Sequence, residues 1–96
     1  MAKDGKYLVA YDIEDDGERR RVSRVVAGFG LRVQKSVFEC RLTRAGLGRL
    51  ERKLLGLELD PAGGCICIYR LSESAKRRQI GDCPVSLDDE QYAFVV

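Results

Sequence analysis

Two apolar periodicities alternate along this chain of 96 residues, and their order constrains the fold more than any other feature. Side chains two positions apart share a face in a strand, whereas those three or four apart share a face in a helix. Strand-like runs occupy residues 6–13, 32–42 and 65–71. Apolar stripes at helical spacing lie between them, over residues 22–29 and 47–57. This order predicts an α+β domain.

The end of the chain adds two shorter segments to this pattern. Residues 79–82 are predicted to form a short strand, and residues 91–96, "QYAFVV", alternate as a late strand would. A four-stranded sheet has no obvious place for the second of these. It would add to a sheet edge, either its own or that of another copy.

The fold class predicted from these elements is a ferredoxin-like β-α-β-β-α-β sandwich with an extra C-terminal strand. It would follow if residues 32–42 and 65–71 pair across the second helix, or if residues 6–13 and 65–71 lie side by side at the sheet centre. The corresponding domain division is residues 1–82 for the sandwich and residues 83–96 for a linker and the extra strand. A domain this small often gains stability by pairing with a second copy.

Polar residues indicate where both helices begin. Asp15 and Glu18 have the spacing of a capping box, in which each side chain accepts a hydrogen bond from a free backbone amide. Thr43 is a typical N-cap residue before the second stripe.

Composition excludes several classes of function. No apolar run approaches the roughly 20 residues that cross a bilayer, and the N-terminus lacks the apolar core of a signal peptide, so we expect a cytoplasmic protein with no membrane partner. The chain has no histidine, which excludes a nucleophile–histidine pair, and it has no phosphate-cradling glycine loop. If the protein is an enzyme, metal-assisted hydrolysis is the chemistry left most open.

Four cysteines are present, Cys40, Cys65, Cys67 and Cys83. In a reducing compartment they are expected to be thiols. Cys65 and Cys67 would share one face of a strand, and without histidine or C-x-x-C pairs a zinc site is disfavoured. We therefore predict a structural role, as in core packing, for all four.

Charge is unevenly distributed along the chain. The net charge is +2, but residues 32–53 hold seven bases and two acids, a local charge of +5. A basic middle segment suggests a polyanionic partner, and the alternative is an ordinary solvated surface.

Asp12 ends the first strand on a face that is otherwise apolar. One interpretation is a ligand for Mg²⁺ or Mn²⁺, which prefer oxygen donors and often use only one or two carboxylates. Two copies related by a two-fold axis would supply a pair of such carboxylates. The alternative is an acid at a solvent-exposed strand end, paired with a nearby arginine.

Charged residues crowd the start of the first helix. Capping and the helix dipole explain its acids. Its arginines, Arg19, Arg20, Arg21 and Arg24, either form a solvated face or contact phosphate, which guanidinium groups match well.

Three segments together resemble the small CRISPR-associated proteins of the Cas2 family. They are "YLVAYDIEDDGERRRV", "GLRVQKSVFECRLT" and "ICIYRL", and the likeness covers residues 6–82 in order. Family members have a first strand ending in Tyr-Asp-Ile, then acids and spaced arginines, and a Gln-x-Ser-Val-Phe run in the second strand. Here Arg20 makes a triple arginine, and Lys35 fills the variable position of the run.

The resemblance implies a homodimer in which the last strand reaches the partner's sheet and the two Asp12 side chains hold a divalent metal. It also implies partners: the Cas1 integrase, and nucleic acid as RNA or double-stranded DNA. By matching position, Asp12 is the implied catalytic residue. The implied nucleic-acid-binding residues are Tyr11, Arg19, Arg21, Arg32, Ser36 and Phe38.

Three functions remain open on this basis. The first is a metal-dependent endonuclease acting in CRISPR spacer acquisition. The second is a non-catalytic adaptor that bridges DNA for the integrase. The third is a toxin-type ribonuclease of a related fold.

Overall fold

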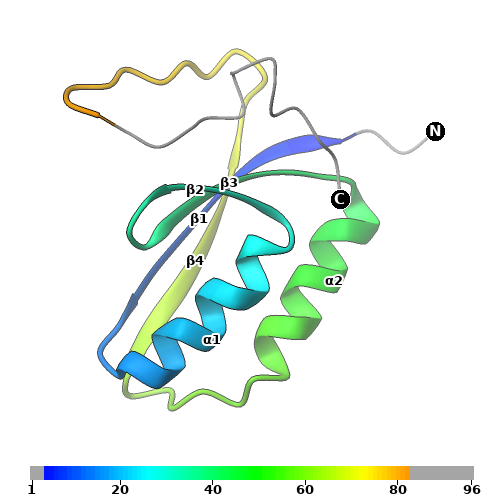
Figure 1. The fold of residues 1–96 in the computed structure, drawn as a ribbon. Helices are drawn as coiled ribbons and strands as arrows, with labels where there is room; N and C mark the ends of the chain where they lie inside the picture. The colour runs from blue at the N-terminus through cyan, green and yellow to red at the C-terminus, as the bar shows by residue number, and fades with distance from the viewer. Residues whose placement is uncertain (1–3, 83–96) are drawn as a thin grey trace.

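The computed structural model describes residues 4–82, which form a four-stranded antiparallel sheet and two helices (Figure 1). Along the chain the elements are β1 (Gly5–Ile13), α1 (Asp16–Ala27), β2 (Gly30–Gln34), β3 (Val37–Leu42), α2 (Arg44–Leu55) and β4 (Gly64–Leu71). The strand order across the sheet is β2-β3-β1-β4, and every neighbouring pair is antiparallel. The predicted ferredoxin-like β-α-β-β-α-β arrangement is confirmed.

The prediction of a single strand over residues 32–42 is wrong, because this segment is the β2–β3 hairpin. The chain turns at Lys35 and Ser36, and β3 then runs antiparallel to β1. The Ser36 carbonyl accepts a hydrogen bond from the Tyr11 amide at 3.1 Å, which ties the turn to the sheet. Val33 and Phe38 are both buried, so the apolar pattern continues through the turn and conceals it.

Two further details differ from the expectation. Residues 79–82 are not a strand. The strand at 64–71 lies beside β1 as predicted, but at the edge of the described sheet instead of its centre. The predicted linker and late strand over residues 83–96 lie outside the described residues.

Both helix starts have the predicted N-caps. The Asp15 carboxylate accepts from the Glu18 amide at 2.8 Å, and the Thr43 hydroxyl accepts from the Gly46 amide at 3.0 Å. The second half of the predicted capping box is wrong, since the Glu18 carboxylate accepts from the Asp60 amide at 3.0 Å. Glu18 therefore ties α1 to the loop that leads into β4.

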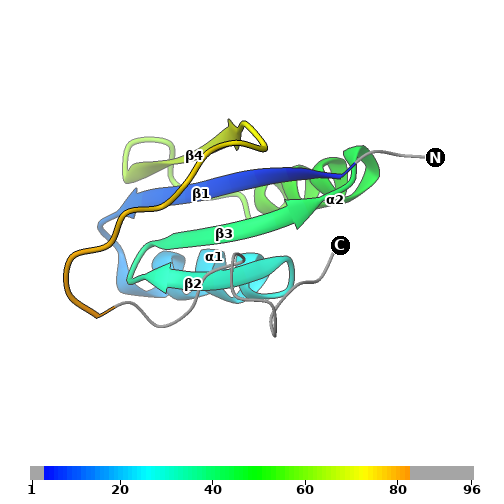
Figure 2. The same cartoon turned by 90° about the horizontal axis from the view of Figure 1, so that it is seen from above.

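The core lies between the helices and one face of the sheet (Figures 1 and 2). On β1 the buried residues alternate with more exposed ones, and they pack with residues of both helices and of β3. Fully buried side chains at the centre are Val9, Val22, Val26, Phe38, Leu42 and Leu50. Within residues 4–82 no helix covers the other face of the sheet.

Neither helix within residues 4–82 has the length and apolar character of a bilayer-spanning segment.

The burial of α2 predicts unequal effects of two similar substitutions. Leu50 is fully buried and Leu55 is 78% exposed on the same helix. Leu50→Ala should lower the free energy of unfolding by about 2–4 kcal/mol, through lost burial and a residual cavity. Leu55→Ala should change it by less than about 0.5 kcal/mol. Urea unfolding followed by circular dichroism measures both, and equal losses would contradict this core.

Candidate functional site

Asp12 is the penultimate residue of β1 and points away from the helices. Its neighbours on the strand, Tyr11 and Ile13, are buried, whereas Asp12 is exposed. Among the described residues its carboxylate has no hydrogen bond or ion pair, so the predicted alternative, pairing with a nearby arginine, does not occur there. An exposed carboxylate without a partner can accept an external cation.

Gly64 brings β4 close to the backbone of Asp12. Asp12 is opposite Cys65 in the antiparallel register, and Gly64 is opposite Ile13. A Cβ on Gly64 would collide with the Asp12 carbonyl oxygen and would lie 2.8 Å from the Ile13 Cα. Gly64 also has φ of +142°, which L residues rarely adopt. Glycine here allows β4 to begin beside the acid.

Arg19 fixes the chain immediately after Asp12. Its guanidinium donates to the Ile13 carbonyl at 2.8 Å and to the Glu14 carbonyl at 3.3 Å, and it pairs with the Asp16 carboxylate. Most of its donors are thereby used within the chain. The predicted phosphate contact would have to compete with these bonds, which tie Arg19 to the end of β1.

The surface that carries Asp12, here called the open face, combines apolar and charged residues. The alternation along β1 and the register of the neighbouring strands place apolar or weakly polar residues on it: Leu8, Ala10, Val37, Cys67, Tyr69 and Leu71. The same register places Lys6, Glu39 and Arg41 on this face, toward the end away from Asp12. Tyr69 is 54% exposed. At the other end of β1 the Lys6 amine donates to the Ala75 carbonyl at 3.5 Å, so the segment after β4 lies over that end. No such contact is made over the end with Asp12 by the residues that the structure describes.

The cysteines divide between the two faces. Cys40 is fully buried in the core, as predicted. The prediction of core packing is wrong for Cys65, which is exposed on the open face, and Cys67 is only half-buried. The adjacent Cys67 thiol, and to a smaller extent desolvation and the Asp12 carboxylate, raise the pKa of Cys65. Cys83 lies outside the described residues.

Tyr11 and Phe38, both predicted to contact nucleic acid, are core residues. They are 5% and 2% exposed, and their rings stack with centroids 6.4 Å apart. Direct contact of these rings with a ligand would require the core to open, so the predicted contact has no support from their placement and stays a prediction. Their place is structural: they fill the space beneath the hairpin that approaches Asp12. The buried Tyr11 hydroxyl has no hydrogen-bond partner among the described residues.

The remaining predicted residues lie in two places. Ser36 is in the hairpin turn, bonded through its carbonyl to Tyr11, and so lies at the same end of the sheet as Asp12. Arg32 contacts the Ser23 hydroxyl on α1 and lies 5.3 Å from the Phe38 ring centroid. Arg21 donates to the Leu57 carbonyl. Each of these two guanidiniums has five N–H donors and keeps some of them free.

The donors present fit a hydrated divalent cation only in part. Within residues 4–82 each chain supplies one carboxylate at this end of the open face, and no group of three or more metal-ligating side chains occurs there. Mg²⁺ can be held by one or two carboxylates with waters completing the shell. A second copy of Asp12 is therefore needed for a paired site.

Two features of this region were missed by the sequence analysis. Cys65 was assigned to the core, although it is the register partner of Asp12. Lys35 was given no role, although it is exposed in the turn at the same end of the sheet as Asp12. The i, i+2 spacing of the cysteines could reveal a shared face, but not which face the helices cover.

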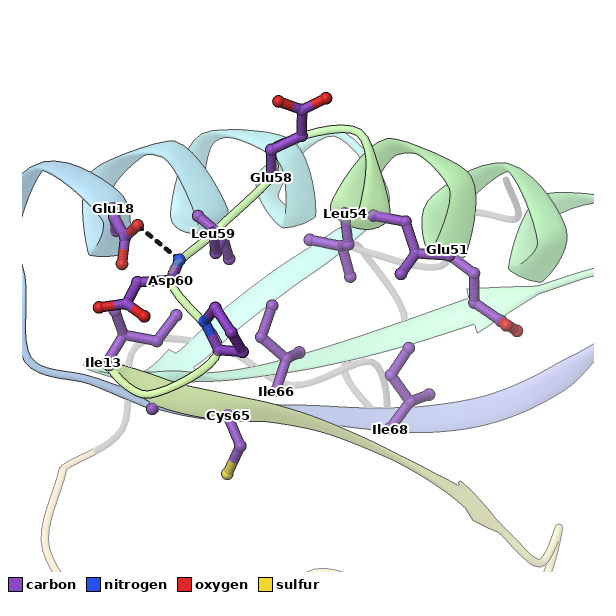
Figure 3. A pocket seen from close by; sticks show the side chains of 14 residues that line it. Ile13, Glu18, Glu51, Leu54, Glu58, Leu59, Asp60, Cys65, Ile66 and Ile68 are labelled. Atoms are coloured by element: carbon purple, nitrogen blue, oxygen red, sulfur yellow. Dashed lines mark hydrogen bonds between the residues drawn. The ribbon is translucent and has the colours of Figure 1, made fainter.

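An apolar groove lies on the other face of β4, beside α2 (Figure 3). Its volume is about 400 Å³, and Ile66, Ile68 and Leu54 line it. Four acids also line it: Glu18, Glu51, Glu58 and Asp60. Figure 3 shows the Cys65 side chain pointing away from this groove, toward the open face.

Comparisons with known proteins agree on one family. The family profile described as CRISPR associated protein Cas2 matches residues 6–79. A protein of Chloroflexus aurantiacus named CRISPR-associated endoribonuclease Cas2 1 is 40% identical over 81% of this chain and 86% of its own length. A protein of Thermus thermophilus named CRISPR-associated endoribonuclease Cas2 is 48% identical over 74% of each chain.

Solved structures show the same fold. A hypothetical protein from Thermus thermophilus has a TM-score of 0.78 and 35% identity, over 86% of this chain and 98% of that one. The Cas2 protein of Streptococcus pyogenes has a TM-score of 0.65 and 30% identity, over 72% and 88%.

Burial of Cys40 predicts a specific loss of stability at high pH. Burial, and secondly the Glu39 carboxylate, raise the pKa of Cys40 from 9.0 to about 12. Between these values the unfolded thiol ionises while the folded one stays neutral, so stability falls as pH rises. The stability advantage of the parent chain over Cys40→Ala should narrow by about 1.4 kcal/mol between pH 8 and pH 10.

Urea unfolding at the two pH values measures this difference. Val22→Ala serves as the control, because it also leaves a core cavity but removes no thiol. The difference in the free energy of unfolding between this variant and the parent should be the same at both pH values. If the difference in the free energy of unfolding between the parent and Cys40→Ala were the same at both pH values, the raised pKa of Cys40 would be refuted.

Proposed function

Because the chain belongs to the CRISPR associated protein Cas2 family, we propose that it is a metal-dependent endonuclease of CRISPR spacer acquisition that acts as a homodimer. The observation that supports this most directly is Asp12, an exposed carboxylate without a partner among residues 4–82, at the end of a sheet face that no helix of these residues covers. The names of the relatives as endoribonucleases favour RNA as the substrate. Double-stranded DNA is the second substrate to test.

The proposed dimer joins the open faces of two copies. Half-buried apolar residues such as Ala10, Val37 and Cys67 lie there, and no helix of residues 4–82 covers them. Burial of such a surface is favourable, and self-association usually follows two-fold symmetry. In this pairing the Asp12 residues of both copies belong to the buried region. The helices face outward.

The roles of individual residues follow from this arrangement. The two Asp12 carboxylates would hold Mg²⁺ or Mn²⁺. When bound, such an ion supplies Lewis-acid stabilisation of phosphate charge and a water of lowered pKa. Arg19 holds the Ile13 and Glu14 carbonyls and so keeps the Asp12 carboxylate at a fixed place. Arg21 and Arg32 would contact backbone phosphates through their remaining donors, which implies little base specificity.

A second function is supported by a separate observation. Residues 4–82 contain no group of three metal ligands, and one carboxylate per chain is a sparse site. A dimer of the same shape could bind DNA and the Cas1 integrase as a bridging adaptor without hydrolysis. Family membership is the ground for this partner, and the two functions differ only in whether Asp12 is required for cleavage.

Asp12→Asn separates the two functions. The change keeps the size of the side chain and removes its charge, so Mg²⁺-dependent cleavage should fall on the order of 100-fold or more, as when a group that stabilises transition-state charge is lost. Binding of RNA and duplex DNA in EDTA should be unchanged. Cleavage is followed on end-labelled substrates with added Mg²⁺ or Mn²⁺.

Glu14→Gln is the matched control, because Glu14 is an exposed acid two residues further on, outside β1. It should cleave like the parent. Equal cleavage by Asp12→Asn and the parent would reject Asp12 as a catalytic residue. Absence of cleavage in the parent, with binding intact, would favour the adaptor.

Tyr69→Glu tests the dimer. A charge at the centre of the open face would be desolvated by pairing, so the variant should be monomeric, whereas the parent should have twice the mass of one chain by light scattering. Ile80→Glu is the control, because Ile80 is fully exposed outside the sheet. Iodoacetamide should also modify Cys65 faster in the Tyr69→Glu monomer than in the parent. A monomeric parent, or equal Cys65 labelling, would exclude pairing through this face.

A further inference from the structure

A second groove opens between α1 and α2, on the side of the molecule opposite the open face. Its volume is about 540 Å³, and Phe29 and Leu57 are among its apolar lining residues. Four cationic side chains line it, Arg21 and Arg24 from α1 with Arg49 and Lys53 from α2, and no acidic side chain of residues 4–82 does. We call it the interhelix groove.

The cations of the interhelix groove are not neutralised within the described chain. Arg24 and Arg49 have no hydrogen bond or ion pair there. Lys53 lies 5.9 Å from the Phe29 ring centroid, and Arg21 donates to the Leu57 carbonyl, which is a neutral acceptor. Four like charges around one groove repel one another, so a bound anion would relieve an existing electrostatic cost.

Helix dipoles do not account for this cluster. Cations are favourable in the last turn of a helix, which covers Arg24 and Lys53. Arg21 and Arg49 lie before the last turn, yet they line the same groove. The four cations come from two helices and meet only in the tertiary structure. The dipole of either helix therefore does not explain why they line the same groove.

The acids of the same region lie elsewhere. Glu18, Glu51 and Glu58 line the apolar groove beside β4 (Figure 3). Asp16 pairs with Arg19. Although the chain has a net charge of only +2, the charged residues that line the groove beside β4 are acids and those that line the interhelix groove are bases.

We propose that the interhelix groove binds the phosphate backbone of nucleic acid, as a contact surface separate from the Asp12 site. Arginine forks and a lysine point charge are the groups that bind phosphate oxygens. On each helix the two cations lie about one turn apart, roughly 5 Å along the axis, so neighbouring phosphates can be contacted together. The inference rests on the proposed nucleic-acid function and adds the place where the backbone is held.

The location has a consequence for the proposed dimer. The open faces meet and the helices face outward, so one interhelix groove lies on each outer layer. The dimer then offers two backbone-binding surfaces away from the metal site. Binding through them should survive loss of Asp12.

Arg24→Ala and Arg49→Ala test the groove, with Arg52→Ala as the matched control. Arg52 is an exposed arginine of α2 that does not line the groove, and its removal changes the net charge equally. The probes are a labelled duplex DNA of about 30 base pairs and a single-stranded RNA of similar length, a span that offers several phosphate contacts. Fluorescence anisotropy in EDTA, over about 50–200 mM salt, gives Kd and its salt dependence.

Each groove variant should weaken binding about fivefold to tenfold near 100 mM salt and reduce the slope of log K against log salt by about one for the duplex. Arg52→Ala should stay within about twofold of the parent. Thermal unfolding of all three variants checks that the fold is retained. Loss of binding to one probe only would identify RNA or DNA as the ligand.

Two results would overturn the inference. In the first, the groove variants bind both probes like Arg52→Ala. In the second, they lose binding to poly-glutamate but not to nucleic acid, which would make the groove a site for an acidic protein. If the parent binds neither probe, the proposed function falls as well. Suppose that the parent binds nucleic acid and that Asp12→Asn abolishes cleavage. If the groove variants then bind as tightly as the parent, only the inference about the groove is rejected, and the proposed function stands.

Discussion

Successive side chains of β1 point to opposite faces of a sheet that the helices cover on one side only. Tyr7, Val9 and Tyr11 enter the core, and the intervening positions lead to Asp12 on the open face. A shift of one residue in register would bury the carboxylate and expose Val9, at the cost of the core. The packing of the core and the exposure of Asp12 are therefore consequences of the same alternation. Gly64 completes the arrangement, because only a residue without a side chain lets β4 begin against the Asp12 backbone.

The open face and the two grooves are three surfaces of one small domain, and each is lined by side chains of a different kind. The open face has apolar residues beside Asp12 and charged residues toward its other end, and the carboxylate suits a cation. Acids line the groove beside β4, and bases line the groove between the helices. The α2 helix separates them, since Glu51 faces one groove while Arg49 and Lys53 face the other. The proposed metal site and the proposed backbone-binding groove therefore lie on separate surfaces of the chain.

Local signals were predicted well and longer-range ones poorly. The Asp15 and Thr43 caps depend on residues three positions apart, so the sequence contains all the information needed. The β2–β3 turn was missed, because apolar residues lie on both sides of it and its stabilising bond comes from Tyr11, in another strand. Glu18 bonds to Asp60, 42 residues away, instead of completing the local capping box. The candidate site shows the same contrast: Asp12 was found from its strand position, whereas its neighbour Cys65 was not.

By itself the sequence determined the alternation of strands and helices, the caps, the absence of histidine chemistry and the family resemblance, because each depends on composition or short spacing. Only the tertiary structure decided which face of the sheet stays open and which arginines are already bonded within the chain. It also buried Tyr11 and Phe38 and brought Arg24 and Arg49 to one groove. These outcomes depend on register and on helix packing, which join residues far apart in the chain, and no local pattern specifies such pairs.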